Sequence, residues 1–206
     1  FLKDQAYDAI KQAILSGELE AGTLVSERSL AERLGMGKAP VRDAISRLNH
    51  EEYLNVSAQQ GIVVRPFSRQ EISDTFEARL IIEPPIAFRL AGRLSATSRS
   101  RLEANLSQQS RSIVDKDTVG FVRLDIEFHL EMLHAHGNRV IVQMMERICE
   151  RTARVIALAF DGKQKHIERA FQQHQAIFQA IISGDAASAE KQVFTHIDST
   201  KNILNY

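Results

Sequence analysis

Hydrophobic residues recur every three or four positions through most of the chain, which predicts a mainly α-helical protein. Within the first 66 residues, helices are predicted at about 4–15, 27–34 and 38–48. Ser26 is a favourable N-cap for the second helix, and Gly35-Met36-Gly37 favours a tight turn before the third. Two short β-like segments follow at 53–57 and 61–65. Three helices and a small β-hairpin predict a winged helix-turn-helix.

A second unit is predicted to begin after Pro66, where Ser68 and Glu71 have the spacing of a capping box. From there to Tyr206 the pattern is helical and almost without strand signals, which predicts an all-α bundle. The expected helices are roughly 69–83, 84–93, 98–114, 118–135, 138–160, 164–183 and 186–204. The pair Pro84-Pro85 is expected to break or kink the chain between the first two. The chain therefore has two predicted domains, residues 1–67 and 68–206.

Composition and charge exclude several classes of protein. The 206 residues are 44% hydrophobic and 25% charged with zero net charge, as in an ordinary folded chain rather than a disordered one. The longest apolar run, 155–160, is far too short to span a membrane. The single Cys149 excludes a disulfide framework and a CxxC zinc module. Without a signal-peptide pattern we expect a cytoplasmic protein, and because the chain begins at Phe1 we expect some upstream sequence to be absent.

The candidate DNA-contacting residues are cations on the second and third predicted helices, namely Arg28, Lys38, Arg42 and Arg47. A recognition helix needs such side chains at its exposed N-terminal end, where base edges and phosphates are met. However, residues 1–66 carry eight Lys and Arg against nine Asp and Glu, a net charge of −1. This balance differs from the basic footprint of a strong isolated DNA binder, so a protein–protein module is the alternative at this point.

Two motifs bear on the choice between a DNA-binding unit and a protein–protein module. They are SERSLAERLG at 26–35 and PVRDAISRL at 40–48. Together with residues 14–19 and the hairpin ending in Gln60-Gly61, they closely resemble the N-terminal domain of GntR-family bacterial transcription regulators. The resemblance implies that a homodimer binds double-stranded operator DNA through Arg28, Lys38, Arg42, Arg47 and, at the wing tip, Gly61. One departure is Gly37-Lys38-Ala39, where the family often has Ser or Thr, then Arg and Thr. The change removes two hydroxyls and replaces a bidentate guanidinium by a point charge.

Polar side chains also point into the apolar stripes of three C-terminal helices. Asp125 and His129 lie one turn apart within one stripe, and His174 and His196 lie within two others. Burying a carboxylate and imidazoles costs several kcal/mol unless they are paired or bind a metal. A lone inward His is usually a hydrogen-bonded core residue, whereas four convergent groups favour a shared cation. His134 falls on the opposite face of its helix and is expected to be solvated.

The same residues carry a second resemblance. The run Asp125-Ile126-Glu127-Phe128-His129, followed by His174 and His196, is similar to the metal-site pattern of the FCD ligand-binding domain, which defines the FadR-type branch of the GntR family. The resemblance implies a six- or seven-helix bundle that provides dimerisation and holds one divalent metal through Asp125, His129, His174 and His196. A small organic acid would complete the coordination. Arg79 is the candidate for pairing the effector carboxylate, and a structural salt bridge with Glu83 is the alternative.

Ligand type alone cannot choose among Zn, Ni and Mn, and we favour Zn for its abundance and affinity. A metal-dependent hydrolase is the rival from another class, because open positions on a metal can activate water. The chain has no HExxH motif, no GxSxG elbow and no Walker or Rossmann fingerprint, so we do not expect an enzyme. A purely metal-sensing repressor is the other alternative. The sequence therefore predicts a ligand-responsive transcriptional regulator, and we expect a repressor because that is the usual case in the family.

Overall fold

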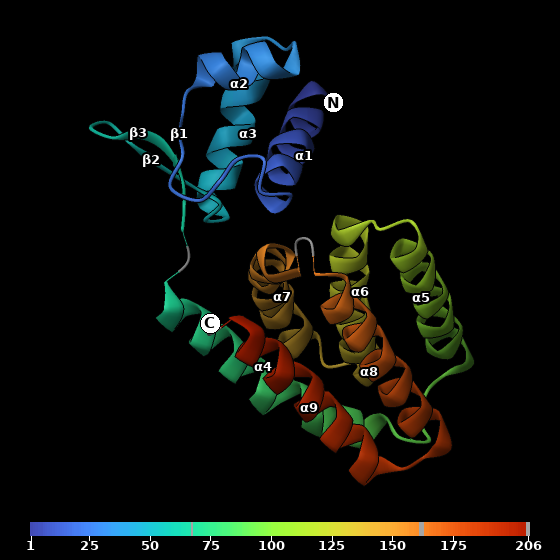
Figure 1. The fold of residues 1–206 in the computed structure, drawn as a ribbon. Coiled ribbons are helices and arrows are strands. Elements are labelled where there is room, and N and C mark those ends of the chain that lie inside the picture. The colour runs from blue at the N-terminus through green and yellow to red at the C-terminus, as the bar shows by residue number, and fades with distance from the viewer. Residues whose placement is uncertain (67, 161–162, 205–206) are drawn as a thin grey trace. The chain divides into compact units, whose positions relative to one another are not determined.

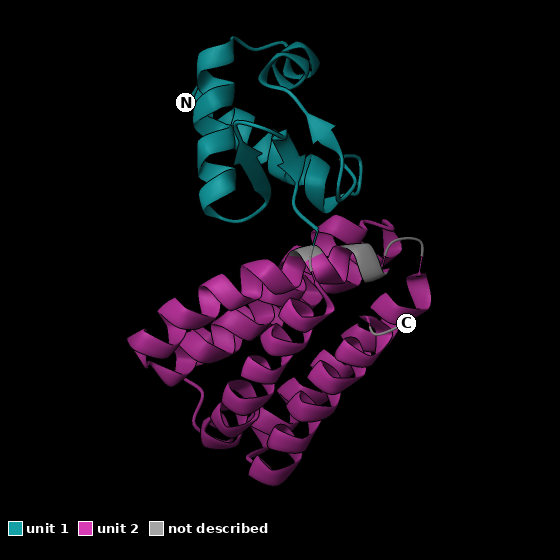
Figure 2. Cartoon of the chain, turned by 90° about the vertical axis from the view of Figure 1, so that its left-hand side faces the viewer, with its two compact units in different colours: residues 1–67 teal, residues 68–206 magenta. Residues whose placement is uncertain are grey.

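The computed structural model describes residues 1–66, 68–160 and 163–204 (Figure 1). The chain divides into two compact units, Phe1–Phe67 and Ser68–Tyr206, which Figure 2 draws in separate colours. The first unit contains helices and a small sheet, whereas the described residues of the second form helices and their connections. The predicted fold class, a winged helix-turn-helix followed by an all-α bundle, is confirmed. No helix in the described ranges is long and apolar enough to cross a membrane.

Unit 1 consists of α1 (Leu2–Leu15), α2 (Glu27–Leu34) and α3 (Lys38–His50) with the strands β1 (Leu24–Val25), β2 (Leu54–Ser57) and β3 (Gly61–Val64). The strands form an antiparallel sheet in the order β1-β3-β2. The hairpin β2-β3 is the predicted wing, while β1 was not predicted because two residues are too few to show an alternating pattern.

Local signals in unit 1 act as the sequence predicts. Ser26 Oγ accepts a hydrogen bond from the backbone N–H of Ser29 at 3.0 Å and caps α2. Gly35 ends the same helix in the left-handed conformation, with φ of 61°. The buried faces of α1 and α3 meet in a core that includes Ile10, Ile45 and Leu48, and this core positions α3.

Unit 2 consists of α4 (Arg69–Leu90), α5 (Ala96–Val114), α6 (Thr118–His136), α7 (Arg139–Phe160), α8 (Gln164–Ser183) and α9 (Ala186–Leu204). Helix α4 lies alongside α9, α5 packs on α6, and α8 packs on α9 (Figure 1). The six helices of the described part agree with the expected six- or seven-helix bundle.

The expected break at Pro84-Pro85 is wrong. The predicted helices 69–83 and 84–93 are one helix, α4, and both prolines lie inside it. The carbonyl groups of Leu80 and Ile81 lose their helical N–H partners there, which is why proline usually ends a helix. The packing of α4 along α9, α6 and α7 favours the continuous helix despite this loss.

The core of unit 2 is mostly apolar and also contains buried polar residues. Aromatic and aliphatic side chains such as Phe76, Phe121 and Met132 fill most of the space between the helices. Among the residues whose burial the structure describes, ten polar or charged ones are embedded in this core: Arg79, Glu83, Asn105, Gln109, Asp125, His129, Thr152, His174, His196 and Thr200. Buried polar groups are rarely retained without partners, so their contacts define the candidate site.

Candidate metal centre and nucleic-acid interface

The four residues predicted as metal ligands meet in the middle of unit 2. Asp125 and His129 come from α6, His174 from α8 and His196 from α9. One potential ligand atom of each lies within 4.8 Å of the others, and all four side chains are buried. The inward direction predicted from helical periodicity is therefore correct for all four, while His134 is exposed, as expected.

Three of these ligand atoms have the spacing of atoms bound to one ion. His174 Nε2 lies 3.2 Å from His196 Nε2 and 3.3 Å from Asp125 Oδ1. His196 Nε2 lies 3.8 Å from the same Asp125 oxygen. Two atoms that each bind an ion at about 2.1 Å lie about 3.0–3.5 Å apart in octahedral or tetrahedral geometry. The arrangement is therefore close to that of a coordination sphere.

A chain of hydrogen bonds determines which nitrogen of His174 carries the proton. The Asn105 amide donates to the backbone carbonyl of Leu124 at 3.0 Å, and that carbonyl can only accept. Asn105 Oδ1 therefore accepts from Gln109 Nε2 at 2.7 Å, which leaves Gln109 Oε1 to face His174 Nδ1 at 2.9 Å. Nδ1 must donate to this oxygen, so the free lone pair of the neutral ring is on Nε2.

A second chain acts in the same way on His196. Ser199 Oγ donates to the backbone carbonyl of His196 at 2.9 Å and accepts from Gln173 Nε2 at 3.2 Å. Gln173 Oε1 then accepts from His196 Nδ1 at 3.1 Å. With Gln173 in this orientation, His196 Nε2 also presents a lone pair to the centre of the cluster. Ser199 Oγ also lies 3.4 Å from Gln173 Oε1, so this chain fixes its ring less strictly than the first chain does.

Burial and neighbouring groups determine the charge states of His174, His196 and Asp125. Burial lowers the pKa of His174 and lowers that of His196 well below its usual value, so both rings are neutral at pH 7. Burial alone would raise the pKa of Asp125, and the neighbouring imidazoles lower it only where they supply a proton or a positive charge. With the Nε2 atoms of His174 and His196 unprotonated, a bound cation would supply the charge that keeps the carboxylate ionised.

The two Nε2 lone pairs and the Asp125 carboxylate repel one another unless a positive charge lies between them. The 3.2 Å contact between the two Nε2 atoms cannot be a hydrogen bond when neither nitrogen carries a proton. Asp125 Oδ2 and His129 Nε2 are buried with no hydrogen-bond partner among the described residues. Unsatisfied buried acceptors of this kind fit a divalent cation, and so does the donor set of three imidazoles and one carboxylate.

The third imidazole, that of His129, lies against a buried ion pair. His129 Nδ1 lies 2.6 Å from Glu83 Oε2, a close contact although it is not aligned as a hydrogen bond. Glu83 Oε1 accepts from Arg79 Nε at 2.6 Å, and both side chains are 1% exposed. Burial opposes ionisation of Glu83, but Arg79 outweighs it and lowers the pKa of Glu83 to about 2. The structure thus contains the salt bridge that was the alternative role for Arg79.

The candidate DNA-contacting cations of unit 1 are exposed, and three of them are paired with carboxylates. Arg42 donates to Glu27 through Nε and Nη2, each at 3.0 Å, which joins α3 to α2. Arg28 Nε donates to Glu32 at 2.7 Å. Lys38 is exposed in the first turn of α3, and Gly61 begins β3 with φ of 76°.

Arg47 differs from the other candidates because it contacts the neighbouring helix. Its guanidinium lies 3.7 Å from the centre of the Tyr7 ring on α1, and its Nε donates to Glu51 at 2.9 Å. The Tyr7 hydroxyl donates to the same carboxylate at 2.5 Å. Arg47 therefore helps to hold α3 against α1, a structural contact that the sequence analysis did not predict.

Comparison with known proteins matches both parts of the chain. Residues 2–64 match the family model described as bacterial regulatory proteins, gntR family, and residues 74–199 match the FCD domain. The chain belongs to the GntR family and carries an FCD domain.

Relatives of this GntR-family chain are transcription regulators. It is 26% identical over 196 residues to the HTH-type transcriptional repressor RspR of Escherichia coli (strain K12), covering 95% of this chain and 86% of the relative. It is 24% identical over 212 residues to the HTH-type transcriptional regulator LutR of Bacillus subtilis (strain 168), covering 93% and 96%. The solved structure of E. coli McbR/YncC has a TM-score of 0.79 at 18% identity over 100% of this chain and 97% of that one, which shows a shared fold.

The residues that orient the imidazoles in this GntR-family chain were missed by the sequence analysis. Gln109 and Asn105 lie on the buried face of α5 beside Leu102, and Gln173 is half-buried on α8. Polar residues inside an apolar stripe were the signal that identified the candidate ligands, and the same signal marks Asn105 and Gln109. Glu83 was named only as a partner of Arg79, because its contact with His129 depends on how α4 packs against α6.

Replacing Glu83 by Ala should destabilise unit 2 of this GntR-family chain by about 3–5 kcal/mol, because it leaves the buried Arg79 without its carboxylate. Chemical denaturation measures the change. Glu77→Ala removes an exposed carboxylate from the same helix and should change the free energy of unfolding by less than about 0.5 kcal/mol. Equal effects of the two substitutions would show that the Arg79–Glu83 pair does not matter for stability.

Proposed function

We propose that this GntR-family protein is a repressor whose affinity for operator DNA changes when a small organic acid binds at a metal site in unit 2. The observation that carries the proposal is the buried cluster of one carboxylate and three imidazoles, in which His174 and His196 present lone pairs toward the same point. A transcription regulator with a ligand-binding FCD domain accounts for such a cluster better than a structural bundle would, because a structural core has no need of unsatisfied acceptors.

The proposed ligands are Asp125 Oδ1 and the Nε2 atoms of His129, His174 and His196. A bound divalent ion would supply positive charge and open coordination positions for an anionic effector. Zinc is the proposed metal, with nickel or manganese as alternatives, because imidazole and carboxylate ligands suit all three. Gln109, Gln173 and Glu83 orient the rings from outside, an arrangement that raises metal affinity at many sites of this kind.

Arg79 has two roles in the proposed metal site. Its ion pair with Glu83 holds a carboxylate against His129. Its buried charge also lowers the pKa values of His174 and His196, after the larger effects of burial and the neighbouring side chains. Because Glu83 neutralises Arg79, a preference of the site for a carboxylate effector would come from the bound cation.

Metal content tests the proposed site directly. We expect about one divalent ion per purified chain, and His174→Ala should remove most of it and lower the melting temperature, because one of the ligands is lost. Elemental analysis and thermal unfolding measure the two effects. His134→Ala is the matched control, since His134 lies exposed on the same helix as two ligands. If chelated protein kept its melting temperature and still responded to organic acids, the cluster would be an ordinary polar core.

The hydrogen-bond chain to His174 generates a sharper prediction. Gln109→Leu removes the acceptor of His174 Nδ1 without removing a ligand, and should weaken metal binding about 10–100-fold. Competition with a chelator of known affinity gives the ratio. Gln108→Leu makes the same substitution at the exposed neighbouring position and should leave metal affinity unchanged. Unchanged affinity in both variants would mean that the chain does not orient the ring.

The same measurements distinguish the proposal from a purely metal-sensing repressor. An acid-responsive repressor keeps its metal while its DNA affinity changes with the acid, whereas a metal sensor releases DNA as free metal rises. A screen of small carboxylates by thermal shift identifies the effector, because a ligand at one hundred times its dissociation constant stabilises the folded state by about 2.7 kcal/mol.

Unit 1 is proposed to bind the operator through Arg28, Lys38, Arg42, Arg47 and the wing at Gly61. Arg42→Ala should weaken specific binding at physiological salt by about 1–3 kcal/mol, because a base or phosphate contact is lost from α3. Gel-shift titration measures the loss. Arg99→Ala is the control, since Arg99 is an exposed, carboxylate-paired arginine of unit 2. If the two variants bind DNA equally well, α3 is not the recognition helix.

We also propose that the protein is a homodimer held together mainly by residues 68–206. With a net charge of −1 over residues 1–66, one winged helix offers little general attraction to DNA, so two must act together. Light scattering at micromolar concentration should give twice the mass of one chain. A monomer, with and without operator DNA, would contradict this assembly.

A further inference from the structure

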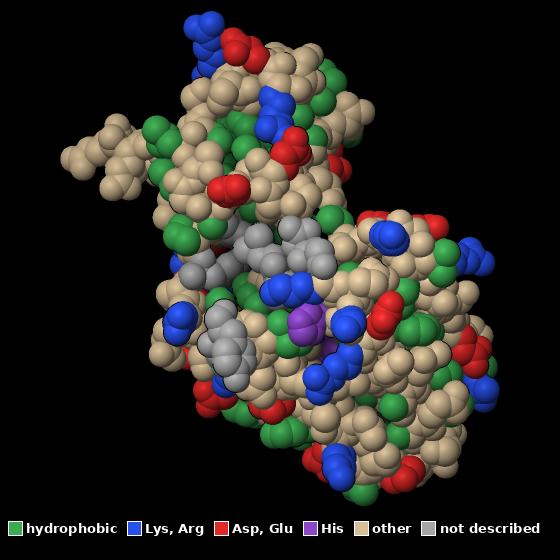
Figure 3. All heavy atoms as spheres, in the orientation of Figure 1, with side chains coloured by type: hydrophobic (Ala, Val, Ile, Leu, Met, Phe, Trp, Pro, Cys, Tyr) green, Lys and Arg blue, Asp and Glu red, His purple; other side chains and the backbone are tan. Residues whose placement is uncertain are grey.

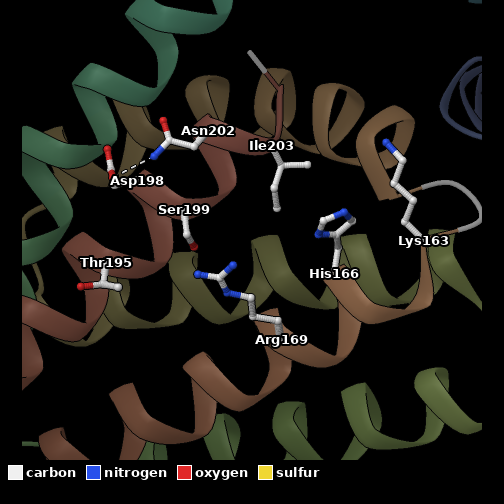
Figure 4. Close-up of a pocket in the computed structure, with 8 residues that line it drawn as sticks. All are labelled: Lys163, His166, Arg169, Thr195, Asp198, Ser199, Asn202 and Ile203. Carbon is white, nitrogen blue, oxygen red and sulfur yellow. Dashed lines mark hydrogen bonds between the residues drawn. The ribbon is translucent and has the colours of Figure 1, made fainter. Parts of the chain in front are cut away.

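A groove on the surface of unit 2 carries cationic side chains that the proposed function does not use. It lies between the start of α8 and the end of α9 and encloses about 530 Å³ (Figure 4). Lys163, His166 and Arg169 line its α8 side at intervals of three residues, so they form one row along the helix. In the space-filling view, Lys and Arg side chains gather around an exposed histidine on this unit (Figure 3).

None of these three side chains forms an ion pair within the part of the chain that the structure describes. The cations of unit 1 behave differently, since Arg28, Arg42 and Arg47 are each held by a carboxylate. The His166 ring is held in place by stacking on Phe160, with 6.2 Å between ring centres and 12° between their planes.

The opposite side of the groove supplies neutral hydrogen-bonding groups. Thr195, Ser199 and Asn202 of α9 line it, and Figure 4 shows the Arg169 guanidinium directed toward Ser199. Asp198 is the acidic group on this side, and it accepts a hydrogen bond from Asn202 Nδ2 at 3.1 Å. The two basic groups Lys163 and Arg169 therefore exceed the single carboxylate before any contribution from His166.

The N-terminal end of α8 adds to the positive electrostatic potential of the groove. Lys163 occupies the N-cap position, where it makes no side-chain capping hydrogen bond. The N-terminal end of a helix carries partial positive charge and free N–H groups, which favour anions. A guanidinium, an ammonium, an imidazole, two hydroxyls and an amide around one pocket are the groups that surround phosphate in many proteins.

We propose that this groove binds the phosphate group of a small phosphorylated ligand, with Arg169 and Lys163 as the main charge contacts. A volume of about 530 Å³ is ample for a phosphorylated metabolite, since small-molecule pockets span about 300–1,000 Å³. The site is separate from the metal cluster and does not depend on it, although Ser199 lines the groove and also belongs to the hydrogen-bond chain of His196.

Titration with inorganic phosphate tests the proposal, with chloride at equal ionic strength as the reference. Calorimetry on the full chain should show saturable binding, and Arg169→Gln should weaken it at least about tenfold, as expected for loss of one charge-assisted contact. Lys165→Gln removes an exposed charge from the same turn of α8 at a position that does not line the groove, and should leave binding unchanged. Arg169 is itself exposed, so the variant should fold normally, which circular dichroism checks.

The His174→Ala variant separates this site from the metal site, because it should lose metal and still bind phosphate as the unchanged protein does. Three results would overturn the proposal. The first is the absence of saturable phosphate binding, and the second is an equal loss in Arg169→Gln and Lys165→Gln, which would indicate diffuse charge. The third is a loss confined to His174→Ala, which would place the phosphate at the metal cluster instead.

Discussion

The central constraint on unit 2 is that His174 and His196 donate outward through Nδ1 and therefore turn lone pairs inward, toward the Asp125 carboxylate. Each outward hydrogen bond belongs to a chain that ends on a backbone carbonyl, which cannot change from acceptor to donor. His174 therefore cannot relieve the repulsion between these groups by exchanging tautomers without breaking buried hydrogen bonds, each worth about 1–3 kcal/mol when left unsatisfied. His196 can do so only if the half-buried Gln173 amide turns over. A bound cation removes the repulsion without disturbing either chain. A metal bound at this cluster would for this reason also stabilise the bundle.

The groups around the cluster come from most of the bundle. The candidate ligands come from α6, α8 and α9, and the groups that contact their rings include Glu83 on α4 and Gln109 on α5. A change at the centre therefore acts on the packing of five helices rather than on one loop. Helix α4 is the first helix of unit 2, and the Glu83–His129 contact connects it to the cluster.

Helical periodicity predicted correctly that the four candidate ligands point inward, because each lies on a helix whose buried face is clearly marked by apolar neighbours. The direction of Asp125 depends only on its own helix, and the same is true of His174. The partners of the imidazoles could be predicted less well. Gln173 contacts His196 across α8 and α9, and Glu83 contacts His129 across α4 and α6. Each contact depends on the relative height and rotation of two helices, which a single sequence does not show. The rule that proline ends a helix gave the wrong prediction at Pro84-Pro85, where packing of α4 along α9 favours one continuous helix.

The charge balance of unit 1 bears on how the proposed repressor discriminates among DNA sites. A net charge of −1 over residues 1–66 gives little of the sequence-independent attraction that basic domains have for phosphates. Arg42 is held by Glu27 in a two-pronged pair, but the pair is exposed and such pairs are worth about 0–1 kcal/mol. Exchanging the carboxylate for a phosphate or a guanine edge therefore costs little where the geometry is right. In the proposed homodimer, specific contacts at two half-sites would supply most of the binding energy, and a change in the spacing of the two copies of unit 1 would be enough to release the operator.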